Sequence, residues 1–381
     1  MKYFPLLWSG LWRKKTRTWL TLCSIVVAFL LFGMLQGVNA AFSHSVAASK
    51  LDRLYVQAKV SFIEPLPYGH MAQIETVKGI DQVGFGNWFG GYYQDPKQFV
   101  FSYAVDPERF FPLYPELILA PEQLQALVNT RTGAVVGSEL AKKYNWKIGD
   151  KVPLKSTIWT HPDGSSDWDF DIVGIFDWPG DTNQASAFYF NYKYFDEGRA
   201  FSKGTVGWYI VHLTDVTKGA EVAAAIDKMF ANSRDETKTQ NEKENTQSFL
   251  RQFGDINFMV SAIIGAVFFA LLFLTGNTMM QSIRERVPEF AVLKTLGFSD
   301  AGVTSLVLGE SLLLCLVAAL IGLGLSVLAF PMLKVAVGVA SLPPQVIALG
   351  IGCAILLAVI IGAVPAMKVK RMSIVDSLAG R

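Results

Sequence analysis

The chain has 381 residues, of which 51% are hydrophobic and 17% charged, with a mean hydropathy of +0.32 and a formal net charge of +2. This composition is too apolar for an ordinary soluble domain and too polar for a protein built only from membrane spans. It predicts a mixed protein, part in the bilayer and part in water. The small net charge, without a block of like charge, argues against a nucleic-acid partner.

The N-terminal stretch combines a basic amphipathic segment with a first membrane span. Apolar side chains recur at helical spacing over residues 1–17, which carry five Lys or Arg and no Asp or Glu. A helix of this kind lies in the membrane interface with its cations among anionic headgroups, so membrane lipids are expected partners. Trp19–Val38 follows without a charge and is long enough to cross a core of roughly 30 Å. We therefore place the first span at residues 18–41.

Two features of this span admit alternatives. Val38-Asn39-Ala40 resembles a signal-peptidase site. However, the apolar run exceeds the core of about 7–15 residues that signal peptides have, which favours an uncleaved anchor. Gly33 and Gly37 form a GxxxG pattern that permits close helix packing, although this spacing is common by chance in apolar runs.

Residues 42–251 contain no further span and predict a water-exposed α+β domain, because strand and helix patterns are interspersed along them. The expected strands are Leu54–Val60, Gln98–Val105, Ala134–Val136, Lys151–Leu154 and Gly207–Leu213, and the expected helices are His70–Val77, Ser138–Tyr144 and Gly219–Phe230. In DWDFDIVGIFDW, one further strand is expected to bury Trp168, Phe170, Ile172 and Ile175 on a single face. The polar run Arg234–Gln252 is either a helical stalk or a linker.

The C-terminal third holds three more spans. They are expected at residues 253–278, 302–330 and 346–366, with an external loop at 331–345 and a basic tail at 367–381. Lys and Arg dominate both residues 1–17 and the tail, so the positive-inside rule places both termini in the cytoplasm. We expect an α-helical membrane protein of the cytoplasmic (inner) membrane, with four transmembrane helices. A large α+β extracytoplasmic domain is inserted between spans 1 and 2.

The stretch between spans 2 and 3, Gln281–Asp300, reads QSIRERVPEFAVLKTLGFSD and is short and densely charged. Pro288 suits the first position of a helix, and Gly297 suits the left-handed conformation that ends one. An apolar stripe at helical spacing is formed by Phe290, Leu293, Leu296 and Phe298. The simple interpretation is a solvated connector. The other is a docking helix whose stripe fills a groove on a partner.

Glu310 lies inside the third span, roughly 10 Å from its start, where a carboxylate is costly unless it is paired or hydrated. One interpretation is a carboxylate near enough to the headgroups to stay wet or to pair with a nearby Arg. The other is a polar contact within the helix bundle that helps to transmit motion.

No catalytic or metal site is visible in the sequence. The four histidines are scattered, and Asp167, Asp169 and Asp171 mimic a calcium loop only briefly, because Ile172 stands where such a loop needs Gly. The solvated face of a strand explains these aspartates better. Neither a phosphate-binding loop nor a nucleophile elbow is present. We expect a non-catalytic chain with no cofactor of its own, and no disulfides in the polar domain, because all three cysteines fall in apolar runs.

Four motifs together resemble the permeases of the macrolide exporter, the lipoprotein-release transporters and FtsX, which are membrane subunits of ATP-binding-cassette (ABC) systems of the mechanotransmission, type VII-like class. The motifs are RKKTRTWLT at the first span, GAVVGSELAKKY…IGDKVPL with DIVGIFD in the polar domain, RERVPEFAVLKTLGFS between spans 2 and 3, and PAMKVKRMSIVDSL after span 4. They cover essentially the whole chain, in the family's order.

The resemblance implies that residues 279–301 form the coupling segment that docks on a cytoplasmic ABC ATPase, which binds the ATP and Mg²⁺. The coupling role falls on Arg284, Arg286, Glu289, Phe290, Leu293, Lys294 and Gly297. The resemblance also implies a permease homodimer or a pair with a homologous permease, and it allows a periplasmic adaptor. An inserted strand-rich subdomain would lie at about residues 110–204 and a stalk at about 234–252. The fused nucleotide-binding domain of the macrolide exporter is not seen here, so its substrate is not carried over.

Two functions of different classes are compatible with these patterns. The first is a permease subunit that converts ATP hydrolysis by a separate ATPase into motion of the outer domain and so drives efflux or envelope transport. The second is a membrane-anchored receptor or regulator whose outer domain binds a ligand or activates an envelope enzyme without ATP coupling. A docking helix between spans 2 and 3 favours the first, since a passive anchor has no use for one.

Overall fold

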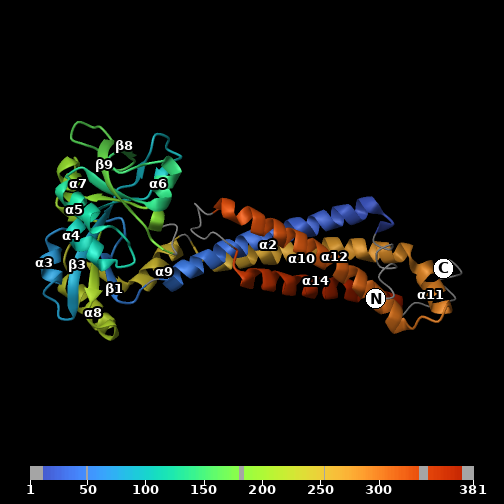
Figure 1. Ribbon diagram of the computed structural model, residues 1–381. Coiled ribbons are helices and arrows are strands. Elements are labelled where there is room, and N and C mark those ends of the chain that lie inside the picture. Colours follow the sequence, from blue (N-terminus) through green and yellow to red (C-terminus); the bar gives the residue numbers. More distant parts are fainter. Residues whose placement is uncertain (1–11, 49, 180–183, 253, 334–341, 371–381) are drawn as a thin grey trace. The chain divides into compact units, whose positions relative to one another are not determined.

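The structure is a computed structural model that describes residues 12–48, 50–179, 184–252, 254–333 and 342–370 (Figure 1). The chain divides into two compact units. The helical unit comprises Met1–Ser43 and Phe253–Arg381, and the α+β unit comprises His44–Gln252. Most of the predicted amphipathic segment 1–17, part of the loop 331–345 and most of the tail 367–381 lie outside the described residues.

The helical unit is built from long helices that run alongside one another (Figure 1). Its elements are α2 Lys15–Ala48, α10 Ile256–Glu285, α11 Val287–Thr295, α12 Asp300–Ala329, η4 Phe330–Leu333 and α14 Pro344–Lys370. Within the described residues, four segments are long and apolar enough to cross a membrane, namely Lys15–Ala40, Asn257–Glu285, Asp300–Ala329 and Pro344–Val369, with mean hydropathies of 2.2 to 2.8. These helices carry apolar side chains on all sides, as the hydrocarbon core of a membrane requires. The predicted fold class, four spans with an α+β domain between the first and second, is confirmed.

Small residues bring α2 and α12 close together. A Cβ on Gly33 would lie 2.3 Å from Ser326 Oγ, and one on Gly37 would lie 2.4 Å from the ring of Phe330. A Cβ on Gly322 would lie 2.5 Å from the backbone of α2. Close approach at small residues is how membrane helices gain packing without a hydrophobic driving force between them. In this chain, the GxxxG face of α2 is therefore occupied by α12 and the residues that follow it.

The α+β unit is organised around one eleven-stranded sheet, in the order β13-β1-β12-β3-β6-β10-β7-β9-β8-β4-β5, and β11 and β2 form a separate pair. The strands are β1 Arg53–Ala58, β2 Leu66–Pro67, β3 Ile80–Trp88, β4 Gly91–Tyr92, β5 Phe99–Val100, β6 Ser102–Val105, β7 Gly133–Gly137, β8 Lys151–Ser156, β9 Asp167–Phe176, β10 Phe188–Asn191, β11 Thr205–Val206, β12 Trp208–Leu213 and β13 Thr237–Asn241. The α-helices are α3 His70–Ile74, α4 Pro107–Phe110, α5 Pro121–Asn129, α6 Ser138–Tyr144, α7 Tyr192–Gly198, α8 Gly219–Met229 and α9 Glu242–Gln252. Short 3-10 turns are η1 Phe111–Leu113, η2 Gln184–Ser186 and η3 Val216–Lys218.

The strands within residues 110–204, where the resemblance implies an inserted subdomain, continue the main sheet. β10 pairs in parallel with β6, from before residue 110, in the register Phe188 to Ser102. β4 and β5, also from before residue 110, extend the sheet beyond β8. Hydrogen bonding therefore joins these strands to the rest of the sheet on both sides.

The strand β9 reaches both hydrophobic cores because a β-bulge interrupts its alternation. Trp168, Phe170 and Ile172 pack in one core, and Ile175 packs against the same core, as the sequence predicts. The register against β7 shifts between Ala134 and Val135, which adds one residue to β9 and moves Phe176 to the other core. A bulge of this kind explains how residues spaced by an odd number can share a face.

The polar run Arg234–Gln252 fits neither of its predicted alternatives as a whole. Its first part forms the edge strand β13, which pairs with β1 over five residue pairs from Leu54–Asn241 to Ala58–Thr237. Its second part forms the helix α9. Likewise, the single strand expected at Gln98–Val105 is divided at Phe101 into β5 and β6. In both places, tertiary pairing rather than local pattern decides where an element begins and ends.

Candidate functional site

The helix α11 lies at the end of the helical unit where α10 ends and α12 begins (Figure 1). Pro288 stands in its first turn, where a missing N–H leaves no bond unmade. Gly297 has a φ of +95°, the left-handed conformation that the sequence predicts. Phe298 N donates to Leu293 O at 3.1 Å, and Gly297 N donates to Lys294 O at 3.1 Å. These two bonds form a Schellman motif, which ends the helix sharply.

Phe290, Leu293 and Phe298, three of the four residues of the apolar stripe, face their own chain. Phe290 is 1% exposed and packs in a cluster of Ile283, Phe290, Val303, Val307, Ala366 and Val369, against which Leu293 and Phe298 also pack. The expectation that Phe290 and Leu293 present a docking surface therefore needs correction. Helical spacing identified the stripe, but the nearest apolar surface available to it is that of α10, α12 and α14. These residues hold α11 in place.

Arg286 and Glu310 form a buried ion pair that fixes the start of α11 to α12. Arg286 Nη1 donates to Glu310 Oε1 at 2.6 Å and to Oε2 at 2.8 Å, and the two side chains are 15% and 5% exposed. The guanidinium carbon also lies 5.1 Å from the centre of the Phe290 ring. The structure shows the pairing with a nearby Arg that the first interpretation of Glu310 includes, and both side chains are largely shielded from water.

Lys294 is a second buried cation on α11. Its Nζ donates to the backbone oxygen of Val369 in α14 at 3.0 Å and lies 2.8 Å from Asp300 Oδ1 at the start of α12. Together with Arg286, it joins the short helix to two different spans. Because a buried charge is strongly destabilising once its partner is removed, both contacts favour one orientation of α11.

The outward face of α11 carries exposed residues that share no pattern in the sequence. Pro288, Glu289, Val292, Thr295 and Leu296 are exposed, Leu296 to 73%. Arg284, before the helix, is also exposed, and Glu289 is paired with Arg13 and Arg286. The sequence does not predict which face of α11 is exposed. Apolar residues occur on more than one side of the helix, and periodicity alone cannot show which side is covered.

A buried arginine joins the two ends of the α+β unit. Arg53, 3% exposed at the start of β1, lies 2.7 Å from Glu116 and donates to Glu242 at 3.1 Å, the latter being the first residue of α9. It also donates to the backbone oxygen of Leu113 at 2.9 Å. Burial raises the pKa of Glu242 despite Arg53. For Glu116, burial also acts to raise the pKa, but hydrogen bonds and the charge of Arg53 lower it overall.

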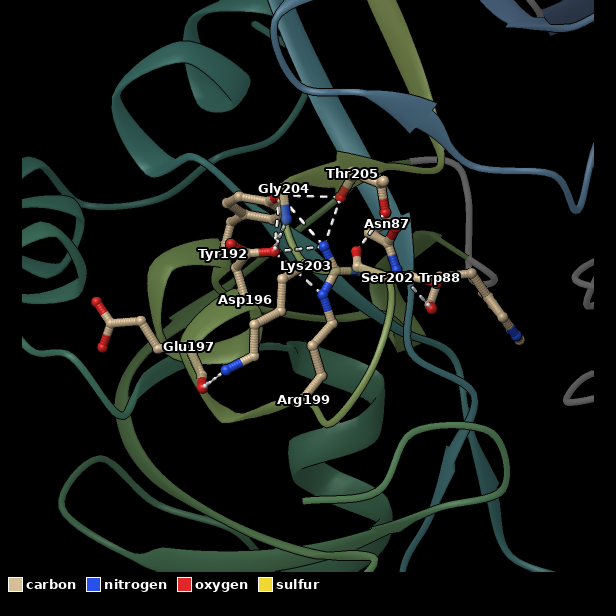
Figure 2. Close-up of polar contacts among 10 residues, drawn as sticks. All are labelled: Asn87, Trp88, Tyr192, Asp196, Glu197, Arg199, Ser202, Lys203, Gly204 and Thr205. Carbon is tan, nitrogen blue, oxygen red and sulfur yellow. Dashed lines mark hydrogen bonds and ion pairs between the residues drawn. The ribbon is translucent and has the colours of Figure 1, made fainter. Parts of the chain in front are cut away.

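A second buried arginine, Arg199, closes the loop that follows α7 (Figure 2). Its Nε donates to Asp196 Oδ1 at 3.1 Å and its Nη2 donates to Thr205 O at 2.8 Å, while Gly204 N donates to the same Asp196 oxygen at 2.8 Å. The guanidinium carbon lies 4.7 Å from the ring centre of Phe195. The contact with the Phe195 ring and the shared carboxylate oxygen hold this loop in one conformation.

The loop that follows α7 borders a cavity of about 230 Å³ in the α+β unit. It is lined by Tyr68, Phe85, Asp106, Pro107, Glu108, Val128, Asn191, Tyr192, Lys193, Asp196, Glu197 and Gly204. The rings of Tyr68, Phe85 and Tyr192 touch one another, with centroids 4.9 to 5.9 Å apart. No motif in the sequence marks this cavity, because its lining comes from five separate stretches of chain.

The aspartates that briefly resemble a calcium loop pair across the sheet. Asp167 lies 3.2 Å from Lys155, and Asp171 lies 3.9 Å from Lys151 and accepts from Thr132 Oγ1 at 2.6 Å. Ion pairs between neighbouring strands of this kind support the strand-face interpretation.

Comparison with known proteins decides the family. Residues 20–229 match the MacB-like periplasmic core domain, and residues 260–374 match the FtsX-like permease C-terminal region. The chain belongs to the MacB- and FtsX-like family of ABC transporter permeases. The outer domain of this permease thus matches one family model and its last three spans match the other, in the expected order.

Relatives of this permease come from archaea and bacteria. The uncharacterized ABC transporter permease MJ1507 of Methanocaldococcus jannaschii is 25% identical over 83% of this chain and 80% of that protein. The uncharacterized ABC transporter permease YknZ of Bacillus subtilis is 27% identical over 44% of this chain and 43% of that one. The macrolide export ATP-binding/permease protein MacB of Chromobacterium violaceum is 35% identical over 27% of this chain and 16% of its own length. Among solved structures, the periplasmic region of MacB from Actinobacillus actinomycetemcomitans covers 55% of this chain and 97% of that one, at 11% identity and a TM-score of 0.39.

Proposed function

We propose that this permease is the membrane subunit of an ABC transporter that couples ATP hydrolysis by a separate cytoplasmic ATPase to a conformational change of its outer domain. The docking element is α11. Its outward face would contact the ATPase, while its inward face passes displacement to α12 and α14. The observation that carries the proposal is the two-sided character of α11. It is exposed at Val292 and at its C-cap Leu296, and it is held on the other side by the buried Arg286–Glu310 ion pair and by the contacts of the buried Lys294 side chain.

Physical argument supports α11 as a lever rather than a connector. A connector between two spans needs no buried charges, and each buried charge favours a single arrangement of its partners. A short helix held in this way moves as one body with the spans it contacts. The exposed leucine and valine then offer an apolar contact, flanked by the charges of Arg284 and Glu289, which is the composition of a specific docking surface.

Leu296→Asp tests the docking face. Burial of a leucine contributes roughly 1.5–3 kcal/mol to an interface, and an aspartate at the same place must also be desolvated. We expect Leu296→Asp to abolish copurification of the ATPase from native membranes and to abolish transport-linked hydrolysis. Glu289→Lys should weaken both less, and more at low salt than at high salt, because rim charges mainly set register.

Ile63→Asp is the matched control, since Ile63 is 74% exposed but lies in the α+β unit. It should leave ATPase copurification unchanged. An ATPase that stays bound to the Leu296→Asp variant would remove the docking role of α11. A wild-type permease that brings down no ATPase at all would favour the receptor alternative.

The proposed orientation places α11 in the cytoplasm and the α+β unit outside the inner membrane. In a background without Cys23, Cys315 and Cys353, we expect a membrane-impermeant maleimide added to intact cells, with any outer membrane permeabilised, to label Lys97→Cys but not Thr295→Cys. Both positions are exposed, so access depends on the side of the membrane. Labelling of Thr295→Cys from outside would contradict this topology.

A further inference from the structure

A groove of about 580 Å³ opens between the first and second spans, at the end of α2 that begins at Lys15. It is lined by Lys14, Lys15, Thr16, Arg17, Leu20, Thr21, Ser24, Leu274, Thr278 and Gln281. All of these residues belong to the helical unit. The groove lies outside α11 and has no part in the docking face described above.

One end of this groove is strongly cationic. Three of its lining residues, Lys14, Lys15 and Arg17, are basic, and none of the described residues that line it is a carboxylate. Glu285, beside the groove, lies 2.9 Å from Lys14 Nζ and 2.8 Å from Arg17 Nη2, so it offsets one of the three charges. The groove therefore keeps an excess of positive charge, and Lys15 is exposed.

The other end of the groove is apolar. Leu20 and Leu274 are both more than half exposed. The hydroxyls of Thr21 and Ser24 donate to carbonyls one turn back in α2, each at 2.9 Å, so they present little polarity to the groove. From Arg17 to Ser24 the helix rises roughly 10 Å, the distance from a headgroup to the upper acyl chain. Along this length the lining changes from cationic to apolar.

We infer that this groove binds an anionic phospholipid. The phosphate lies among Lys14, Lys15 and Arg17, and the acyl chains run along Leu20 and Leu274. Basic pockets between membrane helices at headgroup depth hold acidic lipids in this way. A free phosphate would use only the cationic end, and it would leave the exposed leucines without a partner.

The test uses the full chain in detergent, titrated with dioleoyl phosphatidylglycerol or dioleoyl phosphatidylcholine and analysed by native mass spectrometry. We expect phosphatidylglycerol to bind at least about tenfold more tightly, since two net cations face its phosphate. Lys15→Gln should reduce that preference about fivefold, the effect of one cation near an anionic lipid. Glu285→Gln should raise the preference by a similar factor, because it frees Lys14 and Arg17.

Lys368→Gln is the matched control, because Lys368 is an exposed lysine at the end of α14 and does not line the groove. It should leave the preference for phosphatidylglycerol unchanged. Equal losses in the Lys15 and Lys368 variants would overturn the inference in favour of general surface charge. Equal binding of the two lipids, or displacement of phosphatidylglycerol by millimolar inorganic phosphate, would overturn it as well.

Discussion

Arg286→Met is expected to destabilise the helical unit by about 3–5 kcal/mol, because it leaves the carboxylate of Glu310 buried in a span without a partner. Methionine keeps much of the arginine's apolar contact with Phe290, so the loss reports mainly on the charge. The double variant Arg286→Met with Glu310→Met should recover most of the stability, since two apolar side chains of similar volume replace the pair. Arg284→Met, two residues away and exposed, should have little effect.

Cys315 offers a direct measure of this effect. It is fully buried in α12, the helix that carries Glu310. With Cys23 and Cys353 replaced by serine, a dye that fluoresces on reaction with a thiol reports when α12 opens on heating. We expect earlier reaction in Arg286→Met than in the wild type and near-normal reaction in the double variant. If the double variant reacts as early as the single one, then the ion pair does not couple α11 to α12.

Arg53→Met is expected to destabilise the α+β unit by about 3–5 kcal/mol, because it too removes the cation of a buried ion pair. The change leaves Glu116 and Glu242 close together without the cation that both contact. The two carboxylates then repel each other at the junction of β1 and α9. Adding Glu116→Gln and Glu242→Gln to the variant should restore part of the stability, because the repulsion disappears.

Urea unfolding of residues 42–251, followed by tryptophan fluorescence, measures this loss. The fragment is long enough to bury a core of its own, and we expect it to unfold cooperatively without metal or disulfides. Lys59→Met is the control, because Lys59 pairs with Glu236 at the surface near the end of β1 and its removal should hardly move the midpoint. Equal midpoints for the Arg53 and Lys59 variants would show that the buried network does not stabilise the unit.

The sequence predicts those features that depend on local chemistry. The four spans follow from long apolar runs, and the end of α11 follows from Gly297, because few other residues adopt its backbone conformation. The sequence also predicts that Ile175 shares the buried face of Trp168, although the bulge that makes this possible depends on the register of a neighbouring strand.

Features that depend on distant partners were not predictable in the same way. Phe290 and Leu296 belong to the same apolar stripe in the sequence, yet one is buried and the other exposed, because α10, α12 and α14 cover only one side of α11. The partner of Glu310 lies 24 residues away along the chain, and no spacing rule selects Arg286 among the nearby basic residues. The replacement Leu293→Asp, which the stripe alone would suggest as a docking test, would instead disturb the packing of α11.

The edge of the eleven-stranded sheet has a mechanical consequence. β13 is the edge strand, and it pairs with β1 so that the strand ends leading to α2 and α9 meet at the Leu54–Asn241 pair. A force that pulls these two connections apart would load the Leu54–Asn241 pair first. The hydrogen bonds between β1 and β13 would then break one residue pair after another. A force that moves both connections together would load none of these residue pairs. The edge is therefore compliant to separation and stiff to common displacement. The hydrogen bonds that Arg53 and the Lys50 amide donate to Glu242 resist the separation.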